Sequence, residues 1–223
     1  ELYRRQNMDR YSGVGCFSSI IKCEECGSWY GAKVWHSNDK YRRVIYRCNK
    51  KYGKGCKCKT PHITEDEIKE MFIKAANELF YEKDEIIENT KTMMDIVCNT
   101  DDLDKELGDK VTELNIIAEQ MQTAIAENSR TALDQNEYER RYVDLTERYN
   151  TIKADYDKIS EQIESKKAQR ELFKGFIGAL EKQGALLEEF DEGLWSSLVQ
   201  EVVVNAKDDI RFIFKNGFEI KTR

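Results

Sequence analysis

Residues 23–62 read CEECGSWYGAKVWHSNDKYRRVIYRCNKKYGKGCKCKTPH, and their cysteines decide the fold. Cys23 and Cys26 form a C-x2-C pair, 21 residues separate Cys26 from Cys48, and two more cysteines close the stretch. A C-x2-C turn brings two sulfurs together, and a second pair returning across a hairpin completes the four tetrahedral ligands that Zn²⁺ favours. We expect a structural zinc ribbon, because residues 20–62 hold too little apolar material for a core of their own.

The fourth ligand is open on spacing alone. Cys56 gives C-x7-C with Cys48, whereas Cys58 gives C-x9-C, and the two spacings are about equally suitable. His62 is a third candidate, although its place just before a helix start favours an ordinary structural role. Four thiolates leave no open coordination position, so a catalytic zinc is not expected.

Between the cysteine pairs the sequence predicts a β-hairpin. Segments 29–35 and 41–47 are rich in aromatic and β-branched residues, and HSND between them has turn composition. Cationic side chains crowd on and beside this hairpin and indicate a polyanionic partner, because a two-stranded ribbon can enter the major groove of DNA. The candidate DNA-binding residues are Lys33, His36, Lys40, Arg42, Arg43, Arg47, Lys50, Lys51 and Lys54, and His36, Arg42 and Arg43 lie near the tip, where bases would be read.

Charge is unevenly distributed along the chain. Residues 1–62 hold 14 Lys and Arg against 5 Asp and Glu, whereas the rest of the chain holds 22 against 37. This contrast of +9 with −15 favours nucleic-acid binding over a merely solvated basic surface. The competing hypothesis is a zinc-ribbon and coiled-coil adaptor that binds only proteins. With no run of about 18 apolar residues, no signal peptide and C-x2-C spacing, we expect a cytoplasmic protein that does not cross a membrane.

Beyond the cysteines the sequence becomes helical. Thr64 and Glu67 form a capping box, so a helix should begin near residue 65, and CNTDD at 98–102 offers a break with a new N-cap. Apolar residues then recur alternately four and three residues apart in two seams joined by a short break, which predicts an antiparallel coiled-coil hairpin. The seam residues are Leu107, Val111, Leu114, Met121, Ile125, Tyr142, Leu145, Tyr149, Ile152, Ile159 and Ile163.

The last part of the chain predicts a return to a packed body. A wider apolar stripe at 172–187 is typical of a helix lying on a core, and Asn216-Gly217 between alternating apolar residues predicts a β-hairpin. The expected fold class is therefore α+β: a zinc β-ribbon with packed helices, a long antiparallel coiled-coil hairpin projecting from it, and a C-terminal β-hairpin. The expected parts are 1–19 as the tail of a preceding domain or a linker, 20–100 as zinc ribbon and first helix, 101–168 as arm, and 169–223 as return helix and strands completing the zinc domain.

Two stretches carry a resemblance to a known family. FSSIIKCEECGSWYGAKVWHSNDKYRRVIYRCNKK at 17–51 and KCKTPHITEDEIKEMF at 57–72 resemble the zinc β-ribbon of large serine recombinases, the serine integrases of phages and other mobile elements. The charged helical hairpin resembles the coiled-coil motif inserted in their zinc domain, so the resemblance covers nearly the whole chain. In that family the fourth cysteine directly precedes the T-P-H-like turn. The resemblance therefore favours Cys58 as the ligand beside Cys23, Cys26 and Cys48, with Zn²⁺ as a structural cofactor.

The resemblance also implies a function in DNA recombination. In such proteins an N-terminal catalytic domain carries the serine nucleophile, the recombinase and zinc domains bind the attachment site, and the coiled coil joins DNA-bound subunits. The resemblance implies that residues 1–19 are the tail of the preceding recombinase domain or its linker. No serine here has the setting of a nucleophile, so we expect no catalytic residue in this chain, although its full-length parent would be a site-specific recombinase. The expected partners are double-stranded attachment-site DNA, a second copy bound through the arm, and a recombination directionality factor. The expected location is the cytoplasm, on the nucleoid when DNA is bound.

Overall fold

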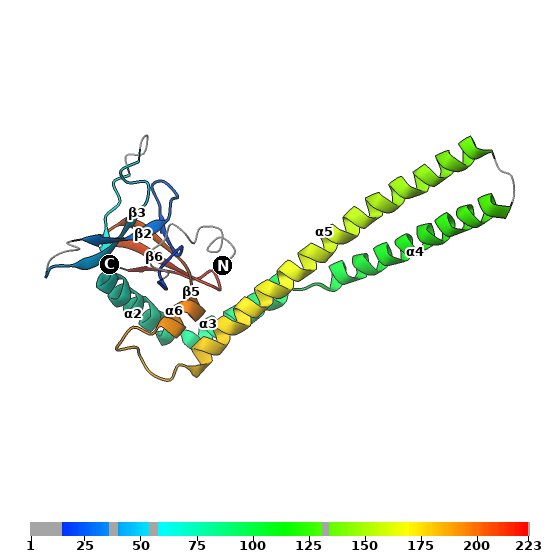
Figure 1. The fold of residues 1–223 in the computed structure, drawn as a ribbon. Coiled ribbons are helices and arrows are strands. Elements are labelled where there is room, and N and C mark those ends of the chain that lie inside the picture. The colour runs from blue at the N-terminus through cyan, green and yellow to red at the C-terminus, as the bar shows by residue number, and fades with distance from the viewer. Residues whose placement is uncertain (1–14, 36–39, 54–57, 131–133, 223) are drawn as a thin grey trace. The chain divides into compact units, whose positions relative to one another are not determined.

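The computed structural model describes residues 15–35, 40–53, 58–130 and 134–222, and it divides into two compact units. Unit 1 joins the part of the chain up to Lys91 with the part from Leu172 onward, and unit 2 is Thr92–Glu171. Two small sheets and several helices confirm the expected α+β class (Figure 1). Most of the expected N-terminal tail lies outside the described residues.

The first sheet of unit 1 contains the predicted hairpin. Strands β2 (Tyr30–Trp35) and β3 (Arg43–Cys48) pair antiparallel, with Tyr30 opposite Cys48 and Trp35 opposite Arg43. The short β4 (Ile63–Thr64) adds to β3, so the strand order is β2-β3-β4. The ladder therefore places one cysteine of the second pair at the base of the hairpin.

The second sheet of unit 1 joins the two ends of the chain. Its order is β1-β5-β6-β7, where β1 is Ile21–Cys23, β5 is Val199–Ala206, β6 is Asp209–Phe214 and β7 is Glu219–Thr222. β6 and β7 are the predicted C-terminal hairpin, and Gly217 in their turn has a φ of 84°, a conformation that glycine adopts without steric cost. β1 pairs with β5 in parallel, which the sequence did not predict.

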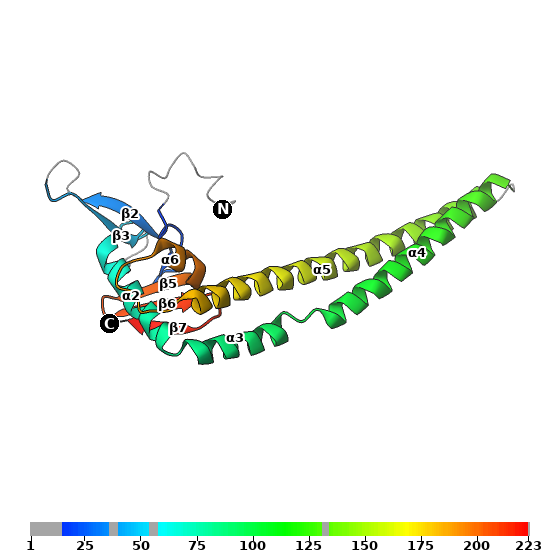
Figure 2. The same ribbon diagram turned by 90° about the horizontal axis from the view of Figure 1, so that it is seen from below.

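Helices cover these strands and close one core. α2 (Glu65–Tyr81) begins at the predicted capping box, in which Thr64 N–H donates to Glu67 over 2.7 Å, and it packs beside β7 (Figure 2). α3 (Lys83–Val97) follows, and the short α6 (Glu192–Leu198) leads into β5. Trp195 of α6 is fully buried against Phe17 and Phe72 at ring distances of 4.8 and 5.2 Å. The core therefore combines residues from both ends of the chain.

Unit 2 is an antiparallel helix pair. α4 (Asp101–Arg130) starts after the predicted break, where Asp101 N–H donates to the Asn99 side chain over 2.9 Å, and α5 (Gln135–Lys182) returns beside it. An ion pair of 3.3 Å joins Arg141 to Glu127, and Lys166 Nζ donates to the Val97 carbonyl over 2.6 Å. The end of α4 therefore meets the start of α5, and the residue before the break meets a later part of α5, so the two helices are antiparallel. A coiled coil remains a prediction.

The structure corrects the expected seam on α4. Ile117 and Ala124 are 2% and 1% exposed, whereas Val111 and Ile125 are 41% and 48% exposed and lie outside the seam. Either pair of residues can be combined with the half-buried Leu107, Leu114 and Met121 at heptad spacing. Which pair is buried depends on the side of α4 on which α5 lies. The remaining expected seam residues are buried or half-buried: Leu107, Leu114, Met121, Tyr142, Leu145, Tyr149, Ile152, Ile159 and Ile163.

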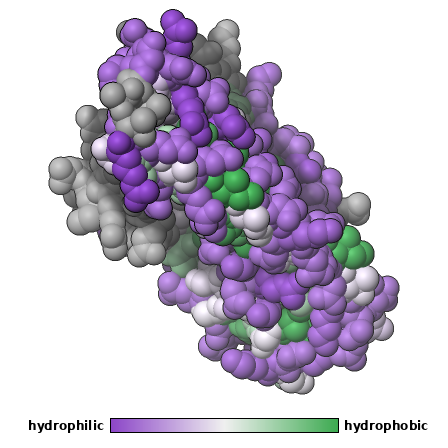
Figure 3. All heavy atoms as spheres, turned by 90° about the vertical axis from the view of Figure 1, so that its right-hand side faces the viewer, coloured by the Kyte–Doolittle hydropathy of each residue, from purple (hydrophilic) through white to green (hydrophobic). Residues whose placement is uncertain are grey.

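Hydrophilic side chains dominate the face of the molecule drawn in Figure 3, with a few hydrophobic groups between them. This agrees with a chain in which 35% of residues are charged. Among the described residues, no helix is both long and apolar enough to cross a membrane.

Candidate metal centre

Four cysteine sulfurs lie together at the junction of the two sheets. The Sγ atoms of Cys23, Cys26, Cys48 and Cys58 are all within 4.8 Å of one another. Cys23 and Cys58 are 3.3 Å apart, and Cys26 and Cys48 are 3.4 Å apart, which is too long for a disulfide of about 2.05 Å. A tetrahedral ion with bonds of about 2.3 Å holds its sulfurs roughly 3.8 Å apart. The cluster therefore fits a four-thiolate metal site.

The first pair of ligands is held by a tight backbone turn. Cys23 ends β1, and the Gly27 N–H donates to its carbonyl over 2.8 Å. Gly27 has a φ of 65°, in the left-handed region that a residue with a Cβ rarely adopts. The glycine directly after C-x2-C thus lets the chain reverse and present both sulfurs to one point.

The structure brings together the four cysteines that the resemblance favours. Cys56, the alternative fourth ligand, lies outside the described residues. His62 is not in the cluster, because its ring packs against Trp35 at 4.7 Å. The sequence-based expectation of an ordinary structural role for His62 agrees with this contact.

Sequence reasoning missed two side chains that support the ligands. Thr60 is 2% exposed, and its Oγ1 lies 2.9 Å from Cys58 Sγ and 3.3 Å from Cys23 Sγ, so its hydroxyl can donate to a thiolate. Glu25 accepts a hydrogen bond from the Lys59 N–H over 2.5 Å. Such contacts orient ligands and tune their basicity. The position of a polar residue between two cysteines, or just after one, was the only sign in the sequence that these side chains could support the ligands.

The sulfurs ionise unequally. Burial opposes ionisation of Cys23, but hydrogen bonds from Thr60 and Cys58 outweigh it and lower the pKa of Cys23 to about 7. Burial raises the pKa of Cys58 to about 11, and burial likewise raises the pKa of Cys26. At neutral pH a metal ion must therefore displace protons from at least Cys26 and Cys58.

We expect metal affinity to rise steeply with pH. A metal binds the thiolate, so at least the two protons on the thiols of Cys26 and Cys58 are released, and the apparent affinity should change by at least about 100-fold per pH unit while both remain protonated. Competition with a chelator of known pH dependence, at pH 6 and pH 7, measures this change. An affinity that differs by less than tenfold between the two would show that these thiols are already ionised before the metal binds.

The ribbon carries cationic side chains next to aromatic rings. Arg43 lies over the Trp35 ring at 5.3 Å, and Arg47 lies over Tyr52 at 4.6 Å. Tyr52 is 74% exposed, and sequence reasoning did not select it. These are cation–π arrangements, in which the ring attracts the guanidinium and favours one position for it.

The strand register gathers part of the predicted basic surface. In the β2–β3 ladder Lys33 lies opposite Ile45, two residues from both Arg43 and Arg47. Since alternate residues of a strand point to the same side, these three cationic residues lie on one face of the hairpin. Within the part of the chain that the structure describes, none of these three side chains is in an ion pair. Lys40, Arg42 and Lys50 are exposed, and His36 and Lys54 lie outside the described residues.

Lys51, one of the predicted DNA-binding residues, also contacts the segment that carries the fourth cysteine. Its Nζ donates to the Thr60 carbonyl over 2.6 Å, directly behind the buried hydroxyl that contacts the sulfurs. The side chain therefore holds the backbone next to Cys58, while its ammonium keeps its positive charge and two further hydrogen-bond donors.

Four cysteines clustered beside the base of a β-hairpin define a metal-binding module of the zinc-ribbon class. The family model of the recombinase zinc beta ribbon domain matches residues 16–77, so this segment is similar to that domain. The match confirms the resemblance to recombinases for the segment that holds all four cysteines.

Two further comparisons complete this result. A solved structure described as "Crystal Structure of a LSR-DNA Complex" is similar over 96% of this chain at 19% sequence identity and a TM-score of 0.35. The chain spans 60% of the length of that solved chain. No curated protein matches this chain.

Proposed function

We propose that this chain is the DNA-binding and subunit-joining C-terminal part of a site-specific serine recombinase that integrates or excises mobile DNA. The observation that carries the proposal is a cationic hairpin face on a segment that matches the recombinase zinc ribbon. DNA cleavage would belong to the catalytic domain that the family resemblance implies, and the protein would work in the cytoplasm on the nucleoid.

The proposed ion is structural Zn²⁺. Soft thiolate ligands favour zinc over harder divalent ions, and four of them close the coordination sphere to water and substrate. Cys23, Cys26, Cys48 and Cys58 would hold the ion, and the bound metal would fix the two ends of the hairpin to each other. The role of the ion is therefore to keep the cationic hairpin in shape.

The hairpin would bind the DNA backbone and read bases at its tip. A two-stranded ribbon fits the major groove, and Lys33, Arg43 and Arg47 share the face that would meet phosphates. Arg42 precedes β3 and is exposed beside the tip, where an arginine can bond to guanine. Exposed aromatic rings next to the cations agree with a surface that meets nucleic acid.

Replacing Arg42 and Arg43 with Ala should weaken DNA binding by at least about tenfold and lower the salt dependence, because each lost phosphate contact reduces the slope of log affinity against log salt by about one. Fluorescence anisotropy on duplex DNA across a salt titration measures both quantities. The variant should retain its metal, since neither side chain touches the sulfurs.

Lys105 and Lys158 provide the matched control. Both are exposed on the helix pair, so replacing them with Ala removes the same charge away from the ribbon. We expect this control to bind DNA as tightly as the unchanged protein. Equal losses in both variants would point to a non-specific charge effect, and no DNA binding at low salt would favour the protein-only adaptor.

The helix pair would join subunits, either to a second copy or to a directionality factor. Val111 and Ile125 are 14 positions apart, which is two seven-residue repeats or about four helical turns. They therefore lie on one flank of α4, with the half-buried Ala118 between them. This flank borders the buried row of Ile117 and Ala124 and leaves Val111 and Ile125 exposed. A row of aliphatic side chains at heptad spacing suits contact with another helix.

Deleting residues 107–163 and bridging the ends should leave DNA binding by the ribbon intact and abolish self-association. The deletion falls inside unit 2, and the metal site and the hairpin belong to unit 1. Analytical ultracentrifugation reports association, and anisotropy reports DNA binding. In the full chain, Val111→Ser with Ile125→Ser should weaken association more than Ile116→Ser, which alters an equally exposed aliphatic residue on another side of α4. Association that survives the deletion would place the subunit contact elsewhere.

A further inference from the structure

The first metal knuckle is built into the C-terminal sheet. Cys23 is the last residue of β1, which pairs in parallel with β5 so that Cys23 stands opposite Val204. The Glu24 N–H donates to the Val204 carbonyl over 3.0 Å, and the Val202 N–H donates to the Ile20 carbonyl over 2.9 Å. Backbone bonds from β5 therefore lie on both sides of a metal ligand, although β5 falls outside the matched ribbon segment.

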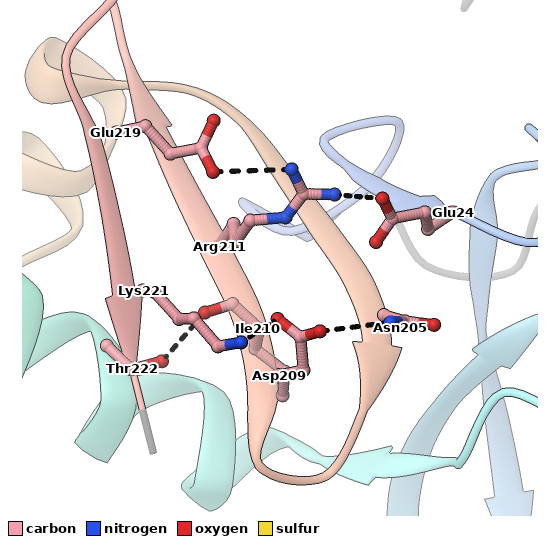
Figure 4. Close-up of polar contacts among 8 residues, drawn as sticks. All are labelled: Glu24, Asn205, Asp209, Ile210, Arg211, Glu219, Lys221 and Thr222. Atoms are coloured by element: carbon pink, nitrogen blue, oxygen red, sulfur yellow. Dashed lines mark hydrogen bonds and ion pairs between the residues drawn. The ribbon is translucent and has the colours of Figure 1, made fainter.

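A charged side chain from the next strand reinforces this connection. Arg211 on β6 forms an ion pair with Glu24, which lies between the first two cysteines, and a second ion pair of 3.3 Å with Glu219 on β7 (Figure 4). Its side chain is 28% exposed, so solvent screens the pair only in part. The guanidinium thus ties the C-x2-C turn to two strands of the C-terminal sheet.

We propose that Arg211 is a positioning residue for the metal centre, and that β5 and β6 set the metal affinity of the ribbon. Arg211 restrains Glu24, and the restrained turn holds the sulfurs of Cys23 and Cys26 where the ion needs them. A turn that is less restrained before binding must lose more conformational freedom when the ion arrives, which lowers affinity. The proposal rests on the proposed metal-binding function.

The coupling acts in both directions. An ion that binds the ordered knuckle stabilises every contact on which that order depends, including the β1–β5 pairing. Removing the metal should therefore loosen β5 as well as the hairpin. A ribbon that folded independently of the C-terminal strands would show no such response.

The first experiment compares Arg211→Gln with Lys221→Gln. Lys221 lies on the same sheet and pairs with Asp209 at 2.9 Å, without contacting the knuckle (Figure 4). Competition of Zn²⁺ between the protein and a chelator should show about fivefold weaker binding for Arg211→Gln, the upper range for a partly exposed ion pair. Lys221→Gln should bind Zn²⁺ unchanged, and Arg211→Lys should recover part of the loss.

A double-mutant cycle separates positioning from general stability. If Arg211 acts through the knuckle, Arg211→Gln should have no further effect on Zn²⁺ affinity once Glu24 is Gln, yet should keep its effect once Glu219 is Gln. A merely structural role in the β6–β7 hairpin reverses this pattern. Independence from Glu24, or equal losses for Arg211→Gln and Lys221→Gln, would overturn the proposal.

Hydrogen exchange tests the reverse direction in the unchanged chain. Chelation of the metal should reduce protection of the Val202 amide more than tenfold, while amides in the middle of α4 stay unchanged. Unchanged protection at Val202 would contradict the proposal. Failure of every variant, and of the unchanged chain, to bind Zn²⁺ would instead refute the metal-binding function itself.

Discussion

Cys48→Ser should abolish tight metal binding and unfold the ribbon. Cys48 is 1% exposed at the end of β3, and it faces Tyr30 at the base of the hairpin. Structural zinc sites contribute on the order of 10 kcal/mol of apparent folding free energy, and three thiolates cannot close the site. We therefore expect loss of bound zinc and loss of DNA binding together.

The spectroscopic outcome should differ between the two units. Trp29, Trp35 and Trp195 all belong to unit 1, so the near-ultraviolet signal should change with loss of the metal. The helices of unit 2 should keep much of the far-ultraviolet signal, because no metal ligand lies in Thr92–Glu171 among the described residues. Cys16→Ser is the matched control. Cys16 lies outside the cluster, so the Cys16→Ser protein should still bind the ion. A Cys48→Ser protein that binds zinc with unchanged affinity would remove Cys48 from the ligand set.

Trp195→Ala should destabilise unit 1 by about 3–5 kcal/mol, the range for removing a large buried aromatic side chain. Trp195 is 0% exposed and packs edge to face against Phe17, Phe72 and Phe212. Its indole N–H donates to the Cys16 carbonyl over 3.1 Å, and Ala leaves that acceptor without its donor. The change should therefore weaken the joint between the two ends of the chain.

Urea unfolding with metal present measures this loss, and the fluorescence of the two remaining tryptophans reports the unfolding. Trp29→Ala is the control, because Trp29 is 38% exposed and contacts Lys22 through a cation–π arrangement. We expect that control to cost about 1 kcal/mol or less. A Trp195→Ala protein as stable as the control would show that the two ends of the chain do not share one core.

Local chemistry made several elements predictable. The Thr64–Glu67 capping box, the hydrogen bond of the Asn99 side chain with Asp101 N–H and the Asn216-Gly217 turn each form within a few residues, so no distant partner is needed to specify them. The β2–β3 hairpin was predictable for the same reason. The C-x2-C spacing identified a metal site because two sulfurs at that spacing already lie close together.

Features that depend on distant partners were not predictable. β1 is three residues long and has no pattern of its own, and it is a strand because β5 lies beside it. The burial of Ile117 and Ala124 in place of Val111 and Ile125 depends on the side of α4 that α5 occupies, and the heptad spacing allows either choice. Thr60 was overlooked because a threonine contacts sulfur only when the chain folds around it.

The sequence by itself determined the class of metal site, the cationic hairpin and the two long helices. The residues that specify each of them lie close together in the chain, within a few helical turns or within one hairpin. Only the tertiary structure decided that the two ends of the chain share one core and that Cys23 is held by β5. Parallel strand pairing and aromatic packing are contacts between segments far apart in the chain, and their energy depends on complementary surfaces that no local pattern encodes.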